Sequence, residues 1–193
     1  MQQDDANKRP RGKDEVRSAL IRAANELFGV RGPDAVSVRD VAKCAEVNHA
    51  LLHRHFGSKE QLLRDVMAEH AASFLQSSTD ASDASEAVNR MFGLMASNPA
   101  FVRIVAHLSL NGHQPDEFVR RDGGLARIVG LLSEDKASDP AAADEARLRA
   151  ASVAAFSMGW LLFESFVLYA SGFEGDEEVA RAFVSCQIAA LLR

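Results

Sequence analysis

The chain has 193 residues, of which 47% are hydrophobic and 25% charged, the composition of an ordinary soluble globular protein. Its first thirteen residues contain no apolar run of the kind that a secretion signal needs, and the cysteines Cys44 and Cys186 form no disulfide or zinc pattern. The longest uncharged stretch, 14 residues at 150–163, is shorter than the roughly 20 of a membrane-spanning helix. We therefore expect a cytoplasmic protein, with 150–163 in a buried core helix.

The net charge of −5 is unevenly distributed along the chain. Residues 1–59 carry eleven Lys and Arg against eight Asp and Glu, a net charge of +3, whereas residues 60–193 carry a net charge of −8. A basic end on an acidic body indicates that the two ends meet different partners, and duplex nucleic acid is one candidate for the basic end.

Nearly every segment has helical periodicity, so the predicted fold class is all-α. A first amphipathic helix is expected at 14–30 and ends at the glycines and proline that follow. Ser37 and Asp40 have the spacing of a capping box, which opens a short helix, and Asn48 is a good N-cap for a third helix that ends near Phe56.

The remainder of the chain predicts further helices. Ser58 and Gln61 form a second capping box at the start of a longer helix, and the Ser- and Asp-rich residues 76–85 predict a loop. The two longest helices are expected at 140–171 and 176–192.

Two short helices joined by a tight turn and held by a preceding helix describe a helix-turn-helix. On a helical wheel Leu52 and Phe56 of the third helix share one face, whereas Ala50 and Arg54 lie on the opposite face. No carboxylate occurs between Val47 and Phe56. Such a surface suits the major groove, because phosphates repel carboxylates, Arg pairs with guanine, and small apolar groups contact the thymine methyl.

The run LFGVRGPDAVSVRDVAKCAEVNHALLHRHFGSKEQLL resembles the DNA-binding segment of the tetracycline-repressor (TetR) family of bacterial regulators. The resemblance covers residues 16–66, about a quarter of the chain, and HFGSKEQLL is its most specific portion. It implies about nine helices, a homodimer clasped by the last two, and a palindromic operator that is released when a small-molecule effector binds. The implied domains are a basic leader at 1–12, a DNA-binding domain at 13–60, and a ligand-binding and dimerisation domain at 61–193.

Carried over position by position, the resemblance assigns phosphate contacts to Ser37 and Lys59 and a base or backbone contact to Arg39. It places four residues of the third helix against the bases, and ring-bearing side chains on either side of the groove. The expected DNA-contact residues are Ser37, Arg39, Asn48, His49, Ala50, Leu51, His53, Arg54, His55 and Lys59.

Three positions depart from the family's usual residues. His53 stands where the family has tyrosine, and we expect its ring N–H still to donate to phosphate, with more pH sensitivity. Leu51 replaces a hydroxyl-bearing residue, which favours a thymine-methyl contact. Glu46 stands where the family has glycine, which suggests a turn without glycine's backbone freedom.

Other chemistry has little support in the sequence. His49 and His53 have i, i+4 spacing, but a structural zinc ion usually needs four protein ligands, so no metal is expected. The run Ser133–Lys136 matches an acyl-serine enzyme pattern without its companion motifs, and no phosphate-loop or dinucleotide fingerprint occurs. We therefore expect neither an enzyme nor a cofactor.

Glu164 is the only charged residue between Arg149 and Glu174. A buried carboxylate needs a partner, so a salt bridge, a helix-cap contact or exposure at the dimer seam is one interpretation, and a pocket for a cationic or hydrogen-bonding ligand is another. Core packing accounts for the surrounding apolar residues equally well. The candidate ligand-binding residues are Met91, Phe92, Met95, Phe101, His107, Phe118, Trp160, Phe163 and Glu164.

The last helix carries an apolar stripe rich in small residues, which together with a stripe on the preceding helix suits a four-helix subunit interface. Packing within one chain would explain the same pattern, and it is the resemblance, not the periodicity, that favours the subunit interface. The members of these stripes are Val179, Ala182, Phe183, Cys186, Ala189, Ala190, Ala151, Ala155, Met158 and Leu162. The prediction as a whole is a homodimeric, ligand-responsive transcriptional regulator. The alternative is a helical small-molecule-binding or interaction protein that no longer reads an operator.

Overall fold

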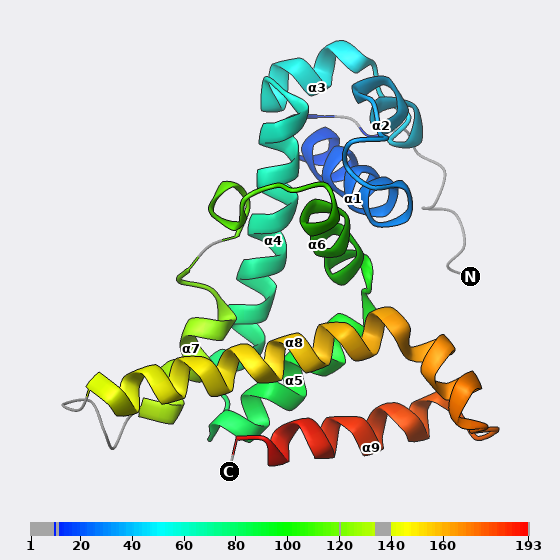
Figure 1. Ribbon diagram of the computed structural model, residues 1–193. Helices are drawn as coiled ribbons and strands as arrows, with labels where there is room; N and C mark the ends of the chain where they lie inside the picture. Colours follow the sequence, from blue (N-terminus) through cyan, green and yellow to red (C-terminus); the bar gives the residue numbers. More distant parts are fainter. Residues whose placement is uncertain (1–9, 11, 120, 134–139, 193) are drawn as a thin grey trace, which may run out of the picture. The chain divides into compact units, whose positions relative to one another are not determined.

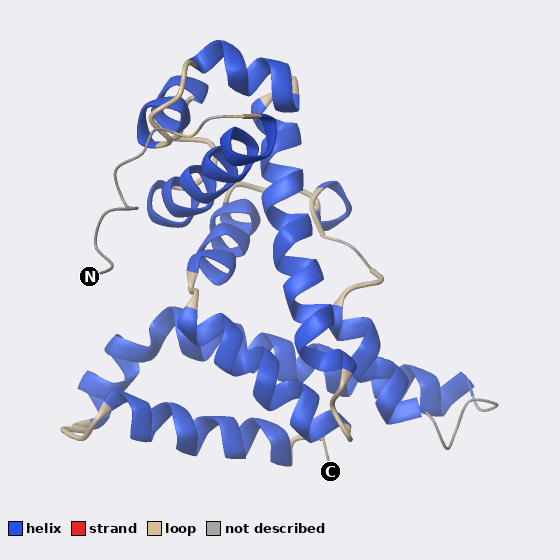
Figure 2. Ribbon diagram, turned by 180° about the vertical axis from the view of Figure 1, so that it is seen from behind, coloured by secondary structure: helices blue, strands red, loops and turns tan. Residues whose placement is uncertain are grey.

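The computed structural model describes residues 10, 12–119, 121–133 and 140–192. These residues form nine α-helices and one short 3-10 helix and contain no strand (Figure 1; Figure 2). The predicted all-α class is therefore confirmed. Most of the predicted basic leader and most of the Ser133–Lys136 run lie outside the described residues.

The chain divides into two compact units. Unit 1 contains the described residues up to Ala68 together with Arg103–Phe118, and unit 2 contains Glu69–Val102 and the described residues from Val119 onward. The helices α4 (Lys59–Thr79) and α6 (Ala100–Leu110) each contribute residues to both units. No motif in the chain indicated that residues 103–118 would group with the N-terminal helices.

Unit 1 is built on α1 (Lys13–Arg31), α2 (Val38–Cys44), α3 (His49–Phe56) and the first part of α4, with the later part of α6 and the 3-10 helix η1 (Pro115–Glu117). The three N-terminal helices pack against one another. Their apolar stripes meet in a core that contains Leu20, Phe28, Val41, Leu52 and Leu62, all fully buried. The predicted first three helices are thus confirmed.

The N-caps of α2 and α3 are those predicted from the sequence. Ser37 accepts a hydrogen bond from the Asp40 amide and the Asp40 carboxylate accepts one from the Ser37 amide, so the capping box is complete. Asn48 Oδ1 accepts from the Ala50 amide at 2.9 Å. The second predicted capping box is only half formed: Ser58 accepts from the Gln61 amide, but the Gln61 side chain donates to Asp65 instead of reaching back.

The loop predicted at 76–85 is wrong in extent. α4 continues to Thr79 and α5 (Ala84–Ser97) begins after four intervening residues, so the connection is much shorter than expected. The hydroxyls of Ser77, Ser78 and Thr79 donate to carbonyl oxygens three or four residues earlier. These bonds satisfy the polar side chains on the helix itself, so a composition typical of loops is accommodated at a helix end.

Unit 2 packs α5 against α7 (Gly124–Ser133) and α9 (Glu177–Ala190), and α7 against α8 (Pro140–Ser171). The core of unit 2 contains Phe74, Val88, Phe92, Ile128 and Ile188, together with other buried apolar side chains. A Cβ atom at Gly124 would lie 2.9 Å from the Phe74 Cβ, so the start of α7 approaches α4 more closely than any side chain allows. The helix predicted at 140–171 is confirmed as α8, and the helix predicted at 176–192 is observed as α9 with Asp176 as its N-cap. The prediction that the last helix is one of the two longest is wrong, because α9 has 14 residues whereas α4 has 21 and α1 has 19.

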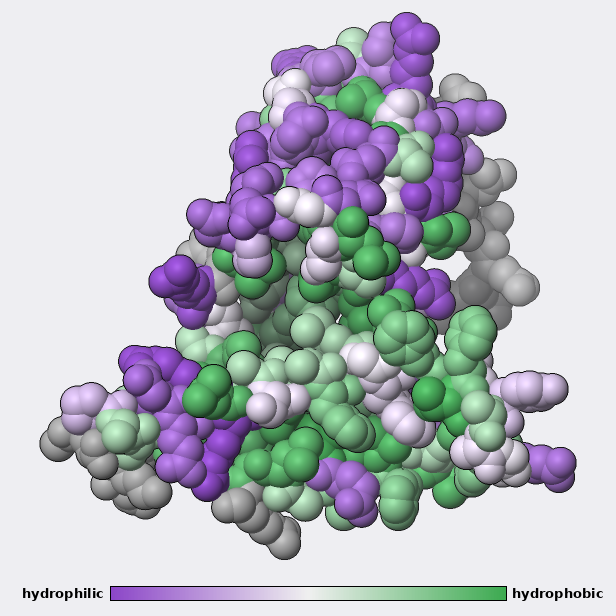
Figure 3. Space-filling view, in the orientation of Figure 1, coloured by the Kyte–Doolittle hydropathy of each residue, from purple (hydrophilic) through white to green (hydrophobic). Residues whose placement is uncertain are grey.

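The expectation of a buried core helix at 150–163 is wrong. α8 is long and apolar enough to cross a membrane by length and composition, yet only 17% of its most apolar window is buried. Only one side of α8 faces the unit 2 core, where Ala150, Val153 and Glu164 are buried. Phe166 is 75% and Tyr169 89% exposed. Figure 3 shows the apolar side chains gathered over α8 and α9.

Candidate nucleic-acid interface

The helix α3 presents two different faces. Leu52 and Phe56 are buried against the rest of unit 1, as the helical wheel predicted. The opposite face is exposed or half-buried and consists of His49, Ala50, Leu51, His53, Arg54 and His55, with the N-cap Asn48 also exposed. This outward surface carries one guanidinium, three imidazoles and two apolar side chains, and α3 contains no carboxylate.

Arg17 on α1 holds α3 in place. Its guanidinium lies 5.4 Å from the centre of the Phe56 ring and also donates to Asp65 on α4 at 2.7 Å. A cation over an aromatic face and an ion pair from the same group both stabilise the arrangement. One side chain therefore ties α1, α3 and α4 together beneath the exposed face.

The turn between α2 and α3 does use a glycine-like backbone conformation, contrary to the expectation drawn from Glu46. Glu46 has a φ of 55°, and it is the only non-glycine residue with a positive φ in the described part of the chain. A side chain in this left-handed region costs about 1–2 kcal/mol because its Cβ crowds the following carbonyl oxygen. The turn therefore has the backbone conformation that glycine adopts without strain, although Glu46 occupies the position and is strained by it.

His53 has its Nδ1 atom 3.0 Å from the Gly57 carbonyl oxygen. Because a carbonyl oxygen only accepts, Nδ1 carries the hydrogen in this arrangement, and a neutral ring presents its Nε2 lone pair to solvent. The expected N–H donation from His53 to phosphate therefore requires either protonation or release from Gly57.

Ser37 and Arg39 lie on the exposed side of the start of α2. The Ser37 hydroxyl donates to Asp40 Oδ2 at 2.7 Å, and the hydrogen bonds from Ser37 hold the pKa of the Asp40 carboxyl below its usual value. A phosphate contact by the Ser37 hydroxyl, as the resemblance implies, requires that hydrogen to turn away from Asp40.

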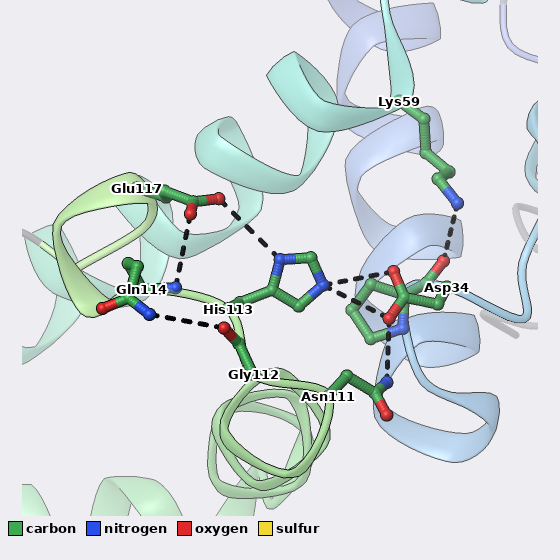
Figure 4. A network of polar contacts seen from close by, with 8 residues as sticks. Asp34, Lys59, Asn111, Gly112, His113, Gln114 and Glu117 are labelled. Carbon is green, nitrogen blue, oxygen red and sulfur yellow. Dashed lines mark hydrogen bonds and ion pairs between the residues drawn. The ribbon is translucent and has the colours of Figure 1, made fainter.

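Lys59 is already engaged within unit 1, because its Nζ donates to the Pro33 carbonyl oxygen at 2.9 Å. Figure 4 shows this bond beside a network around Asp34, which accepts from Asn111 and His113. Sequence reasoning missed this network, because its members are 77 and 79 positions apart and carry no shared motif.

The candidate ligand residues are divided between the two units. Five of them, Met91, Phe92, Met95, Phe101 and Trp160, lie in the unit 2 core or against it. Phe163 on α8 is 54% exposed. His107 and Phe118 belong to unit 1, where His107 lies against Gly32 and Phe118 packs on the His113 ring. Membership of a ligand pocket stays a prediction for all of them.

Glu164 is buried and fully paired. It accepts from Arg181 Nε at 2.9 Å, from Arg181 Nη2 at 2.6 Å and from Trp160 Nε1 at 3.1 Å. Of the interpretations left open by the sequence, the structure shows a salt bridge, made with a residue of α9 that the sequence did not identify.

The predicted apolar stripe of α9 points away from the core of its own unit. Ala180, Val184 and Ile188 are buried, whereas Val179 is 62% and Phe183 65% exposed. The exposed or half-buried stripe residues on the two helices are Val179, Ala182, Phe183, Cys186, Ala189, Ala190, Ala151, Ala155, Met158 and Leu162. No group of three or more metal-ligating side chains occurs among the residues that the structure describes.

Residues 20–66 match the family model described as bacterial regulatory proteins, tetR family. The HTH-type transcriptional repressor Rv3405c of Mycobacterium tuberculosis is 32% identical over 176 residues, which cover 90% of this chain and 88% of that protein. The HTH-type transcriptional regulator BetI of Rhizobium meliloti is 49% identical over 47 residues, 24% of this chain and 23% of that protein.

Solved structures share the fold. The putative transcriptional regulator SCO4942 of Streptomyces coelicolor superposes with a TM-score of 0.69 at 18% identity, over 92% of this chain and 96% of that one. A transcriptional regulator of the TerR/AcrR family from Aquifex aeolicus gives a TM-score of 0.67 at 15% identity, over 91% and 96% of the two chains.

Proposed function

Because the chain belongs to the TetR family of bacterial transcriptional regulators, we propose that it acts as a repressor that reads a palindromic operator as a homodimer. The observation that carries the proposal is the face of α3: His53, Arg54 and Ala50 are exposed, and no carboxylate accompanies them. A helix with this surface is attracted to phosphate and carries a guanidinium that can pair with guanine.

The remaining DNA-contact residues surround that helix in the proposed complex. Ser37 and Lys59 contact phosphates, Arg39 contacts a base or the DNA backbone, and Arg54 reads a base edge. With one half-site per subunit, the half-site centres lie roughly 34 Å or a small multiple of that apart.

The exposed apolar face of α8 and α9 supports the homodimer. Large side chains such as Phe183, Phe166 and Tyr169 are more than half exposed in the single chain. Exposed apolar patches of this kind mark interaction surfaces, and a two-fold axis buries the same patch from both subunits. In the proposed dimer this burial removes the apolar face of α8 from water, so the helix needs no membrane to cover it.

A small-molecule effector is proposed to bind unit 2 and release the operator by favouring a dimer geometry whose two α3 helices no longer match the operator spacing. The apolar side chains Met91, Phe92, Met95, Phe101 and Trp160 are the candidate contacts there.

A gel-shift experiment with the DNA that flanks the protein's own coding region tests operator binding. We expect a retarded complex that resists competition by unrelated duplex and weakens steeply as salt rises, because phosphate contacts release counterions. Equal competition by flanking and unrelated DNA would contradict the proposal and would favour a helical ligand-binding protein without operator reading.

A further inference from the structure

The loop between α1 and α2 is held by residues from far along the chain. Asp34 Oδ2 accepts from Asn111 Nδ2 at 2.8 Å, and His113 Nε2 lies 3.3 and 3.2 Å from the two carboxylate oxygens (Figure 4). Asp34, Asn111 and His113 are called the Asp34 network below. All three belong to unit 1, so the network lies within one compact body.

The two residues before Asp34 are fixed as well. Lys59 Nζ donates to the Pro33 carbonyl oxygen at 2.9 Å. Gly32 has a φ of 80°, and a Cβ atom there would lie 2.8 Å from His107 Nδ1, so only glycine fits against the His107 ring. Three consecutive residues of the loop are therefore held by contacts with α4, with α6 and with the segment that follows α6.

His113 is itself held in position. Its ring packs edge-on against the buried Phe118 with 5.6 Å between centroids, and its Nδ1 lies 3.8 Å from Glu117 Oε2. The charged groups around the ring are thus the Asp34 and Glu117 carboxylates, with the Lys59 ammonium on the adjacent Pro33 carbonyl. A side chain fixed on three sides places its N–H in a defined position for Asp34.

This loop leads directly into the DNA-binding helices. Ser37, the N-cap of α2, follows Asp34 by three residues, and α2 packs against both α1 and α3. A shift of the loop therefore moves α2, and with it the support of α3. Displacements of about 1 Å are enough to misalign hydrogen bonds between a positioned helix and base edges.

We propose that Asn111 and His113 are positioning residues for operator binding, which act through Asp34 although they lie outside the DNA-binding motif. The inference rests on the proposed operator binding by α3. Asp34 and Asn111 are exposed and His113 is half-buried, so their contacts contribute little to overall stability. Their role is to select one position of the loop among several of similar stability.

The test uses the full chain and a duplex selected from a random library by the unmodified protein, with affinity measured by fluorescence anisotropy. We expect Asp34→Ala, Asn111→Ala and His113→Ala each to weaken binding about three- to tenfold, the effect of losing one or two charge-assisted hydrogen bonds. The midpoint of thermal unfolding should move by less than about 3 °C. The double variant Asp34→Ala/His113→Ala should bind no more weakly than Asp34→Ala alone.

Two control variants sharpen the result. His113→Gln keeps an N–H donor near the Nε2 position and should restore most of the affinity that His113→Ala loses. Asp116→Ala removes an exposed carboxylate from η1, the same segment, without touching the Asp34 network, and should bind as the unmodified protein does.

The outcomes separate the two proposals. If the unmodified protein enriches no duplex, operator binding fails and the inference falls with it. If the unmodified protein binds its selected duplex, and the Asp34→Ala and His113→Ala variants bind that duplex as tightly as the unmodified protein does, only the inference about positioning residues is overturned. The inference would also be overturned if the losses of affinity in the single variants added up in the double variant. It would be overturned as well if the losses of affinity followed a fall in thermal stability, because the Asp34 network would then only stabilise the fold.

Discussion

Arg181 on α9 forms a two-point hydrogen-bonded ion pair with the buried Glu164 on α8, with Nη2 2.6 Å from Oε2 and Nε 2.9 Å from Oε1. The hydrogen bond with Glu164 raises the pKa of Arg181 above its ordinary value, so the guanidinium stays charged. The pair joins the two helices that carry the proposed subunit interface.

Replacing Arg181 should destabilise the fold, because it leaves the Glu164 carboxylate buried without its cation. We expect Arg181→Leu to lower the free energy of unfolding in urea by about 2 kcal/mol, and the double variant Arg181→Leu/Glu164→Leu to recover much of that loss. Arg147→Leu, which removes an exposed ion pair with Asp144, should cost less than about 0.5 kcal/mol. Equal costs for Arg181→Leu and Arg147→Leu would show that the Glu164 pair is not structural.

A charge placed on the exposed face of α9 should separate the proposed dimer. Phe183→Glu puts a carboxylate where a second apolar surface is expected, so light scattering should give the mass of one 20.9 kDa chain instead of twice that mass. Val30→Glu alters a similarly exposed apolar residue on α1 and should leave the dimer intact. A Phe183→Glu protein that still has twice the chain mass would place the interface elsewhere.

Relief of the strained turn should stabilise unit 1. Glu46→Gly removes the Cβ that crowds the left-handed backbone, at an entropic cost smaller than the strain, so we expect about 0.5 kcal/mol of added stability in urea unfolding. Glu46→Ala removes the same charge but keeps the Cβ, and should give no such gain. A glycine variant less stable than the alanine variant would contradict this reading of the turn.

His70 on α4 should make stability pH-dependent in mildly acidic solution. Burial lowers the pKa of His70 below its ordinary value of 6.5, and the ring lies among the aromatic rings of Phe74 and Phe101. The unfolded chain therefore binds a proton more readily than the folded one, and stability should fall as the pH drops below about 6.5. Thermal unfolding of His70→Gln between pH 5 and 7 should show a shallower fall than that of the unmodified protein.

Glu86→Gln provides a control that acts in a different pH window. Hydrogen bonds from Ser82 and Arg90 lower the pKa of Glu86 to about 2, so its contribution is present above pH 4.5 and is lost as the pH falls toward 2. The Glu86→Gln variant should keep the slope between pH 5 and 7 unchanged. If His70→Gln also keeps that slope, His70 is not the group responsible.

Local contacts explain why much of unit 1 could be predicted from the sequence. The Ser37–Asp40 and Asn48–Ala50 caps span two or three residues, so the sequence alone contains both partners. The outward face of α3 followed from helical periodicity, and the family from a long continuous motif.

Contacts between distant residues account for what the sequence missed. Arg181 lies 17 positions after Glu164, and Asn111 lies 77 after Asp34, so only the folded chain brings these residues together. The backbone of Glu46 was misjudged because a residue other than glycine can adopt the left-handed conformation at a cost, so the absence of glycine does not exclude that conformation. The exposure of α8 was missed because an uncharged stretch of this length does not distinguish side chains packed in a core from side chains exposed at the surface.

Selection of binding sites from a random duplex library, repeated with Arg54→Ala and Lys59→Ala, tests most directly whether α3 reads bases. We predict that the unmodified protein enriches an inverted repeat, that Arg54→Ala loses preference at one position in each half-site, and that Lys59→Ala keeps the repeat while binding every sequence more weakly. Enrichment of no sequence, or an unchanged preference at every position in the Arg54→Ala protein, would contradict the account.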